Sequence, residues 1–162
     1  MYWIPTVMLL AHVAEEFPRF PAWATRHFGT TSRAWYVYSH IALIALSVTV
    51  SAQAQVLAPR TAWPILALAL QWGLAINSLF HITTSVLFRE YSPGVVTGTV
   101  LCLAATAYLF HHALVVDLLT ISQVVSAVAL GTVFSAAAIA SLWLRMDFDW
   151  KFRRPSSKRG DD

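Results

Sequence analysis

The sequence predicts an all-α integral membrane protein: a bundle of five transmembrane helices with the N-terminus outside and the C-terminus in the cytoplasm. Of the 162 residues, 57 % are hydrophobic and 12 % are charged, whereas soluble domains carry about 25 % charged residues. Four stretches without Asp, Glu, Lys or Arg each exceed the roughly 20 residues that a helix needs to cross a bilayer. They cover residues 34–59, 61–88, 91–116 and 118–144. This pattern excludes a soluble globular domain, a disordered chain and a nucleic-acid-binding module.

Proline and glycine mark the joins between the expected helices. Pro59 and Pro64 flank one join, and Ser92, Pro93 and Gly94 form another. The helices are expected over residues 2–17, 35–58, 62–88, 94–115 and 119–146. Together they form one transmembrane domain over residues 1–148, followed by a polar, basic cytoplasmic tail over 149–162.

The first segment and the orientation both follow from charge. Residues 1–14 are uncharged and have no basic start, so they do not resemble a secretory signal. If they cross as a fifth span, ten of the eleven Lys and Arg residues lie on the side of the C-terminus, and Arg60 alone lies opposite. Cytoplasmic loops are rich in Lys and Arg. We therefore expect a multi-pass protein of the cell (inner) membrane whose helices contact the lipid bilayer.

Several ionisable side chains fall inside these segments, where they are energetically costly and indicate function. At 100° per residue, His12 shares one helix face with Glu15 and Glu16. Asn77 and His81, four residues apart, share a face of another helix. The topology places both faces in the cytoplasmic half of the membrane.

His40 is expected at the same depth, so a single polar cluster should form there. Imidazole and carboxylate ligands suit zinc or iron, and helical bundles build such sites from side chains on facing helices. We expect a divalent transition metal, one or two ions, with ligands drawn from His12, Glu15, Glu16, His40 and His81. Glu15, Glu16 and Asn77 are the candidate catalytic residues, with a spare carboxylate acting as general base.

Structural alternatives exist for each of these residues. Glu15 and Glu16 could be solvated at the interface, with Arg19 nearby. His40 could form only a hydrogen bond to another helix, and Asn77 could serve only to join helices.

Other residues are expected to be structural. His27 should be solvated in the first connection, His111 and His112 should lie at the outer interface, and Cys102 should be a small packing residue. Three small residues at four-residue spacing predict a packing groove on the last helix: Ala127, Gly131 and Ser135.

The run from His12 to Glu16 followed by Phe-Pro-Ala-Trp at 20–23 resembles the opening of the H-x-x-E-E domain family of small membrane proteins. The Asn77-x-x-x-His81 pattern and residues 91–97 are similar to later motifs of that family. The resemblance covers the chain to about residue 115. It implies a multi-span membrane domain whose activity is uncharacterised, and it supports treating His12, Glu15, Glu16, Asn77 and His81 as one functional set.

A second similarity is to intramembrane proteases that process prenylated proteins, which combine two glutamates and an arginine with histidine and asparagine on later helices. The spacing differs here, so this similarity concerns chemistry alone. It shows how glutamates and a histidine could activate water without a metal.

Three classes of function remain open. The leading hypothesis is a membrane metalloenzyme that hydrolyses a lipid or amphipathic small molecule by metal-activated water. The first alternative is a non-haem iron or di-iron oxidoreductase acting on a membrane substrate. The second is a small proton or cation transporter, or a structural membrane subunit. No nucleic-acid partner is expected, and the sequence leaves the oligomeric state open.

Overall fold

The computed structural model describes residues 1–29, 31–57 and 62–152, with side chains up to residue 142. Over these residues the fold is all-α, as predicted, and no strand is present. The elements are α1 (Ile4–Glu16), α2 (Phe20–Phe28), α3 (Arg33–Leu57), α4 (Trp63–Phe88), α5 (Val95–Thr97), the π-helical turn η1 (Gly98–Cys102), α6 (Leu103–Val115) and α7 (Ile121–Phe152).

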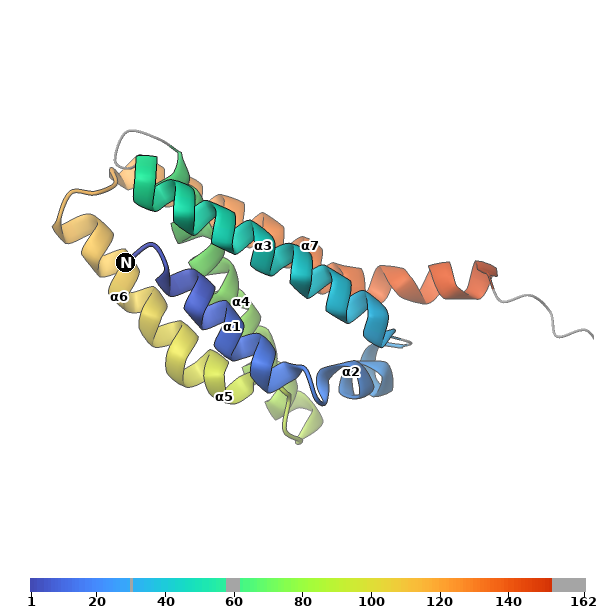
Figure 1. Ribbon diagram of the computed structural model, residues 1–162. Coiled ribbons are helices and arrows are strands. Elements are labelled where there is room, and N and C mark those ends of the chain that lie inside the picture. The colour runs from blue at the N-terminus through green and yellow to red at the C-terminus, as the bar shows by residue number, and fades with distance from the viewer. Residues whose placement is uncertain (30, 58–61, 153–162) are drawn as a thin grey trace, which may run out of the picture.

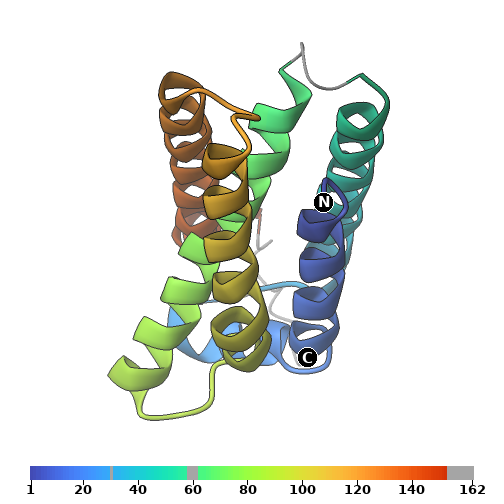
Figure 2. The ribbon, with the colours of Figure 1, turned by 90° about the vertical axis from the view of Figure 1, so that its left-hand side faces the viewer.

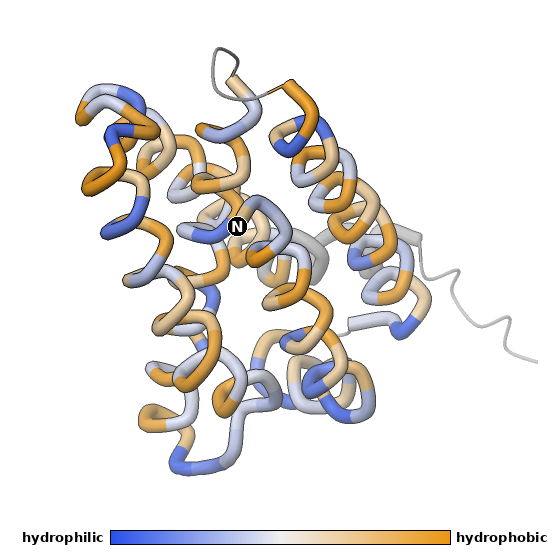
Figure 3. The backbone as a smooth tube through the Cα atoms, turned by 60° about the vertical axis from the view of Figure 1, so that its left-hand side comes forward, coloured by the Kyte–Doolittle hydropathy of each residue, from blue (hydrophilic) through white to orange (hydrophobic). Residues whose placement is uncertain are grey.

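Four helical segments are long and apolar enough to cross a membrane, which supports the prediction of a membrane protein. They are Arg33–Leu57, Trp63–Phe88, Val95–Val115 and Ile121–Leu142, with mean hydropathies of 1.5 to 2.0. Hydrophobic residues predominate along the middle of these helices (Figure 3). The third segment is one helix in which α5, η1 and α6 follow one another without a gap. The sequence did not indicate the π-helical turn η1.

α1 is the shortest of the segments that were expected to cross. Its 13 residues give a length of about 20 Å at 1.5 Å per residue, against a hydrocarbon core of about 30 Å. It lies against α3 and α4 within the bundle (Figure 1). A fifth full span, and the orientation of the bundle, remain predictions.

α4 is the central helix. It contacts α1, α3, α6, η1 and α7, and it runs through the bundle with α7 on one side and α1 and α3 on the other (Figure 2). In the most apolar stretch of α4, 44 % of the residues are buried in the protein, against 17 % in the corresponding stretch of α7. Most residues of this part of α7 are therefore not buried inside the bundle.

The predicted packing groove on α7 is confirmed. Ala127 and Ser135 are buried, and a Cβ atom on Gly131 would come within 2.4 Å of the carbonyl oxygen of Ala69. The Ser135 hydroxyl donates a hydrogen bond to the Gly73 carbonyl oxygen at 3.0 Å. The small residues thus allow α7 to approach the backbone of α4 closely.

The first connection, expected as a loop over 18–34, contains the helix α2. Pro21 lies in its first turn, a favourable position for proline. Phe20, Trp23 and Phe28 turn inward and form a buried cluster with Tyr36 and Leu142. α2 therefore closes one end of the bundle. Arg26 and His27 in its last turn conceal this role in the sequence.

The last helix continues past its predicted end at residue 146, to Phe152. Residues 147–152 contain neither proline nor glycine, so nothing in their sequence ends a helix there. The division into a domain over 1–148 and a tail over 149–162 stays a prediction, and residues 153–162 lie outside the described part of the chain.

Candidate metal centre

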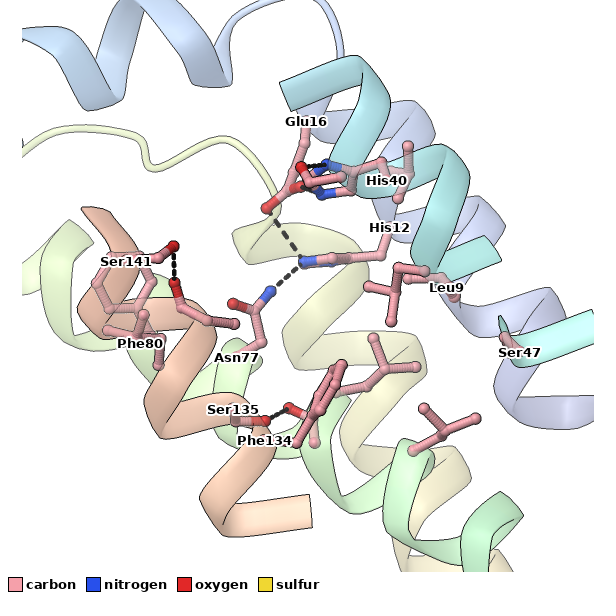
Figure 4. Close-up of a pocket in the computed structure, with 18 of the residues that line it drawn as sticks. Leu9, His12, Glu16, His40, Ser47, Asn77, Phe80, Phe134, Ser135 and Ser141 are labelled. Atoms are coloured by element: carbon pink, nitrogen blue, oxygen red, sulfur yellow. Dashed lines mark hydrogen bonds and ion pairs between the residues drawn. The ribbon is translucent and has the colours of Figure 1, made fainter. Parts of the chain in front are cut away.

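The carboxylate of Glu16 lies at the centre of the predicted polar cluster. It is 3 % exposed, which is incompatible with the solvated position considered above. Its Oε1 atom is 2.8 Å from Nε2 of His81 and 3.4 Å from Nε2 of His12. Its Oε2 atom is 3.4 Å from Nε2 of His40 and accepts a hydrogen bond from the Tyr36 hydroxyl at 3.0 Å. Three imidazoles from three helices thus surround one buried carboxylate. Figure 4 shows two of them, His12 and His40, beside Glu16.

The four-residue spacings explain this convergence. His12 and Glu16 lie one turn apart on α1, and Asn77 and His81 lie one turn apart on α4. Asn77 extends its amide nitrogen to Nε2 of His12 at 2.8 Å and to Nε2 of His81 at 3.2 Å. The two helices thus place their imidazole nitrogens beside a common point.

His12 is held by a hydrogen bond on its other ring nitrogen. Nδ1 of His12 lies 3.0 Å from Oγ1 of Thr97. The Thr97 hydroxyl donates its single hydrogen to Glu15, so it accepts a hydrogen bond from Nδ1 of His12. In the neutral ring Nε2 then carries the lone pair, which accepts a hydrogen bond from the Asn77 amide at 2.8 Å and lies 3.4 Å from Oε1 of Glu16.

His40 is held in the same manner. Its Nδ1 atom lies 2.7 Å from the Tyr36 carbonyl oxygen, which can only accept a hydrogen bond. Its Nε2 lone pair therefore also faces Glu16 when the ring is neutral. The ring stacks on Tyr36 with centroids 3.9 Å apart, which fixes its plane.

His81 completes the pattern. It is fully buried, and its Nδ1 atom lies 2.9 Å from the Ser92 hydroxyl. Each of the three rings therefore uses Nδ1 for an outward hydrogen bond and turns Nε2 towards Glu16. Outward hydrogen bonds of this kind orient histidine ligands in metal sites.

A carboxylate buried among imidazole nitrogens is stabilised by hydrogen-bond donors or by a cation. At Glu16 a hydrogen on Nε2 of His81, 2.8 Å away, or a bound metal ion could take this role. One ligand atom from each of His12, Glu16 and His81 lies within 4.8 Å of the others. Two ligands of a tetrahedral ion, each about 2.1 Å from it, are roughly 3.4 Å apart, so this donor set fits a transition metal.

The structure brings together His12, Glu16, His81, Asn77 and His40, and it directs Glu15 elsewhere. The Glu15 carboxylate accepts hydrogen bonds from backbone N–H groups at the start of α5, those of Gly94, Val96 and Thr97. It also accepts from the Tyr91 and Thr97 hydroxyl groups. A carboxylate is favourable at a helix N-terminus. Glu15 thus holds Thr97, the residue that orients His12.

The turn between α4 and α5 covers the centre. Gly94 has φ +105°, and a Cβ atom there would lie 2.8 Å from Cε1 of His12 and 3.1 Å from Cε1 of His81. Ser92, in the same turn, contacts His81. Only glycine combines this backbone conformation with such close approach.

Sequence reasoning missed three supporting residues: Tyr36, Ser92 and Thr97. Tyr36 lies one turn before His40 on α3, so its four-residue spacing is a signal that could have included it. Ser92 and Thr97 lie in the 91–97 stretch, where nothing local indicates which hydroxyl contacts which ring.

His27 also differs from expectation. It was predicted to be solvated, but its Nε2 atom lies 2.7 Å from Glu90 and its ring stacks on Phe88 with centroids 3.9 Å apart. The hydrogen bond from His27, together with Arg26 at 3.2 Å, lowers the pKa of the Glu90 carboxyl below its usual range. This contact joins α2 to the end of α4.

One of three comparisons with known proteins found a match. The family described as a protein of unknown function with an HXXEE motif matches residues 3–109, about two thirds of the chain. This chain belongs to the HXXEE family. The matched region contains all of the cluster, from His12 to Thr97. No curated protein and no solved structure matches the chain.

Proposed function

We propose that this HXXEE protein is a metal-dependent membrane enzyme whose ion, zinc or iron, is bound by His12, Glu16 and His81. His40 adjoins the ion as a fourth ligand or as a base. The enzyme would lie in the inner membrane as five antiparallel segments, with the metal centre in the cytoplasmic half. Its substrate would be a lipid or another amphipathic molecule.

The outward hydrogen bonds of the three imidazoles carry this proposal. A buried carboxylate and histidines that serve only to join helices need no common orientation of their rings. Here each Nδ1 atom has its own partner and each Nε2 atom points to Glu16. In His12 and His40, where Nδ1 donates the outward hydrogen bond, this arrangement directs the Nε2 lone pair towards the centre. A cation would take the place of the Asn77 amide at Nε2 of His12.

Hydrolysis is the reaction we favour. A bound metal ion supplies a water molecule that is nucleophilic near neutral pH. Because Glu15 is committed to the start of α5, the general base passes to His40, whose Nε2 lone pair faces the centre. His40 would take a proton from the water as its oxygen adds to the carbonyl carbon of an ester or amide. The proton would then pass to the leaving alcohol or amine, while Asn77 donates a hydrogen bond to the developing oxyanion.

One observation favours the second candidate, an iron oxidoreductase. The closest ligand group consists of two histidines and one carboxylate, and this set also holds iron in non-haem oxygenases. The identity of the metal separates the two reactions, since zinc indicates hydrolysis and iron indicates oxygen chemistry.

The metal content of the purified protein tests the proposal. We expect about one zinc or iron ion per chain in protein purified in detergent without chelators, and loss of that ion in His12→Ala and His81→Ala. His111→Ala is the matched control, because His111 is exposed on α6 and lies outside the cluster. A metal content far below one ion per chain, or equal content in all variants that remain monodisperse, would contradict the proposal.

A further inference from the structure

A cavity of about 290 Å³ extends from the metal centre along the inside of the bundle. Its polar end is formed by His12, Glu16, His40 and Asn77, with Ser39 beside them. The remaining wall is mainly leucine, phenylalanine and other apolar side chains from α1, α3, α4 and α7. In Figure 4 Leu9, Phe134 and Asn77 surround the same space.

The cavity is elongated. On α3 its wall runs from Trp35 to Ser47 and on α4 from Phe80 to Leu70, spans of about 18 Å and 15 Å at 1.5 Å per residue. Its volume of about 290 Å³ is well above the roughly 10–15 Å³ that one water molecule needs. An apolar cavity of this kind does not favour water. Its dimensions fit one unbranched hydrocarbon chain.

The cavity opens towards the bilayer between α3 and α7. Among its lining residues Phe134 is 49 % exposed, and Ala138, one turn further along α7, is also exposed. Both lie on a helix most of whose residues are not buried inside the bundle. A molecule dissolved in the membrane could therefore reach the metal centre without leaving the hydrocarbon layer.

We infer that this cavity binds a substrate with a single unbranched hydrocarbon chain, with the polar end at Glu16 and His40 and the chain extending towards Pro5 and Leu70. The inference rests on the proposed function, because it names the substrate class of the same centre.

Photo-crosslinking with two forms of dodecanol tests this orientation. One form carries a diazirine at the terminal carbon and the other carries it beside the hydroxyl group, and both are added to the protein in phosphatidylcholine nanodiscs. The hydroxyl is neutral and can donate to Glu16 or His40, so binding does not depend on a metal ion. We expect the terminal diazirine to label the wall around Pro5 and Leu70, and the other to label Ser39 and its neighbours.

Replacing either of two neighbouring alanines of α7 by phenylalanine provides the matched comparison. Ala138→Phe fills the cavity and should reduce both labels about tenfold or more. Ala137→Phe adds the same ring to an exposed position that does not line the cavity and should leave labelling unchanged. Metal content should be normal in both variants. Equal labelling of the two variants, or labels spread over the lipid-facing surface, would overturn the inference.

The two proposals fail separately. If the protein contains no metal but is still labelled in the expected order, the inference of a chain-binding cavity stands and the proposed reaction is refuted. If the protein contains metal but Ala138→Phe does not change the labelling, the metal centre stands and this substrate class is refuted.

Discussion

Replacing Gly94 by alanine should disturb the candidate metal centre and lower the stability of the fold. The backbone at Gly94 has φ +105°, a conformation that costs an L-residue about 1–2 kcal/mol. The added Cβ would also lie 2.8 Å from Cε1 of His12 and 3.1 Å from Cγ of Glu16. Moving packed side chains to admit a methyl group typically costs a further 1–3 kcal/mol. The free energy of unfolding should therefore fall by about 2–5 kcal/mol.

Metal affinity separates the cost of backbone strain at Gly94 from the displacement of His12 and Glu16. Displacing His12 should weaken metal affinity about 10–100-fold, the range found when residues that orient metal ligands are changed. Gly29→Ala is the matched control, because Gly29 also has a positive φ, 92°, but lies after α2 and outside the cluster. Affinity is measured by competition with a chelator in detergent, and stability by thermal unfolding.

Gly29→Ala should lower stability and leave metal affinity unchanged. If Gly94→Ala binds metal as tightly as the wild-type protein, then the turn does not press on the ligands as described. The geometry of the centre would then need revision.

Three other predictions concern residues around the centre. Thr97→Val removes the hydroxyl that orients His12 and should weaken metal affinity about tenfold or more, whereas Thr97→Ser should restore it; chelator competition measures both, and equal affinities would refute the role. Tyr36→Phe removes a hydrogen bond to the buried carboxylate and should lower thermal stability by about 1.5–3 kcal/mol, since the neighbouring charge stays buried; an unchanged melting temperature would contradict this. Glu90→Gln should destabilise the protein at neutral pH but not in acid, because a lowered carboxyl pKa stabilises the fold above the ordinary carboxyl pKa and this contribution is lost as pH falls through the lowered value. Thermal unfolding at both pH values checks it, and an equal deficit in acid would show that the contact to His27 does not depend on the charge.

The helices and much of the cluster could be predicted from the sequence because both depend on simple periodicities. Uninterrupted apolar stretches fix the spans, and four-residue spacing fixes which side chains share a face. His12 with Glu16 and Asn77 with His81 follow from that rule. His40 could be added because the alternating direction of the helices sets its depth.

The different fates of Glu15 and Glu16 could not be predicted. Adjacent residues on a helix point about 100° apart, so only one of them faces the imidazoles while the other reaches the start of α5. That start lies about 80 residues further along the chain, and its position depends on how α5 packs against α1. The same holds for Thr97, whose contact with His12 arises only in the folded bundle.

α2 was missed for another reason. Arg26 and His27 made it look like a polar connection, although Phe20, Trp23 and Phe28 are buried on one face. A helix of nine residues shows too few turns for its periodicity to stand out from a polar connection.

X-ray absorption spectroscopy of the purified protein tests the central claim most directly, since it reports the ligands of the metal itself. We predict two or three imidazole nitrogens and one or two oxygens at about 2.0–2.2 Å, with the imidazole signal reduced in His81→Ala and no sulfur ligand. A metal coordinated without imidazole, or a spectrum that is identical in His81→Ala, would contradict the account.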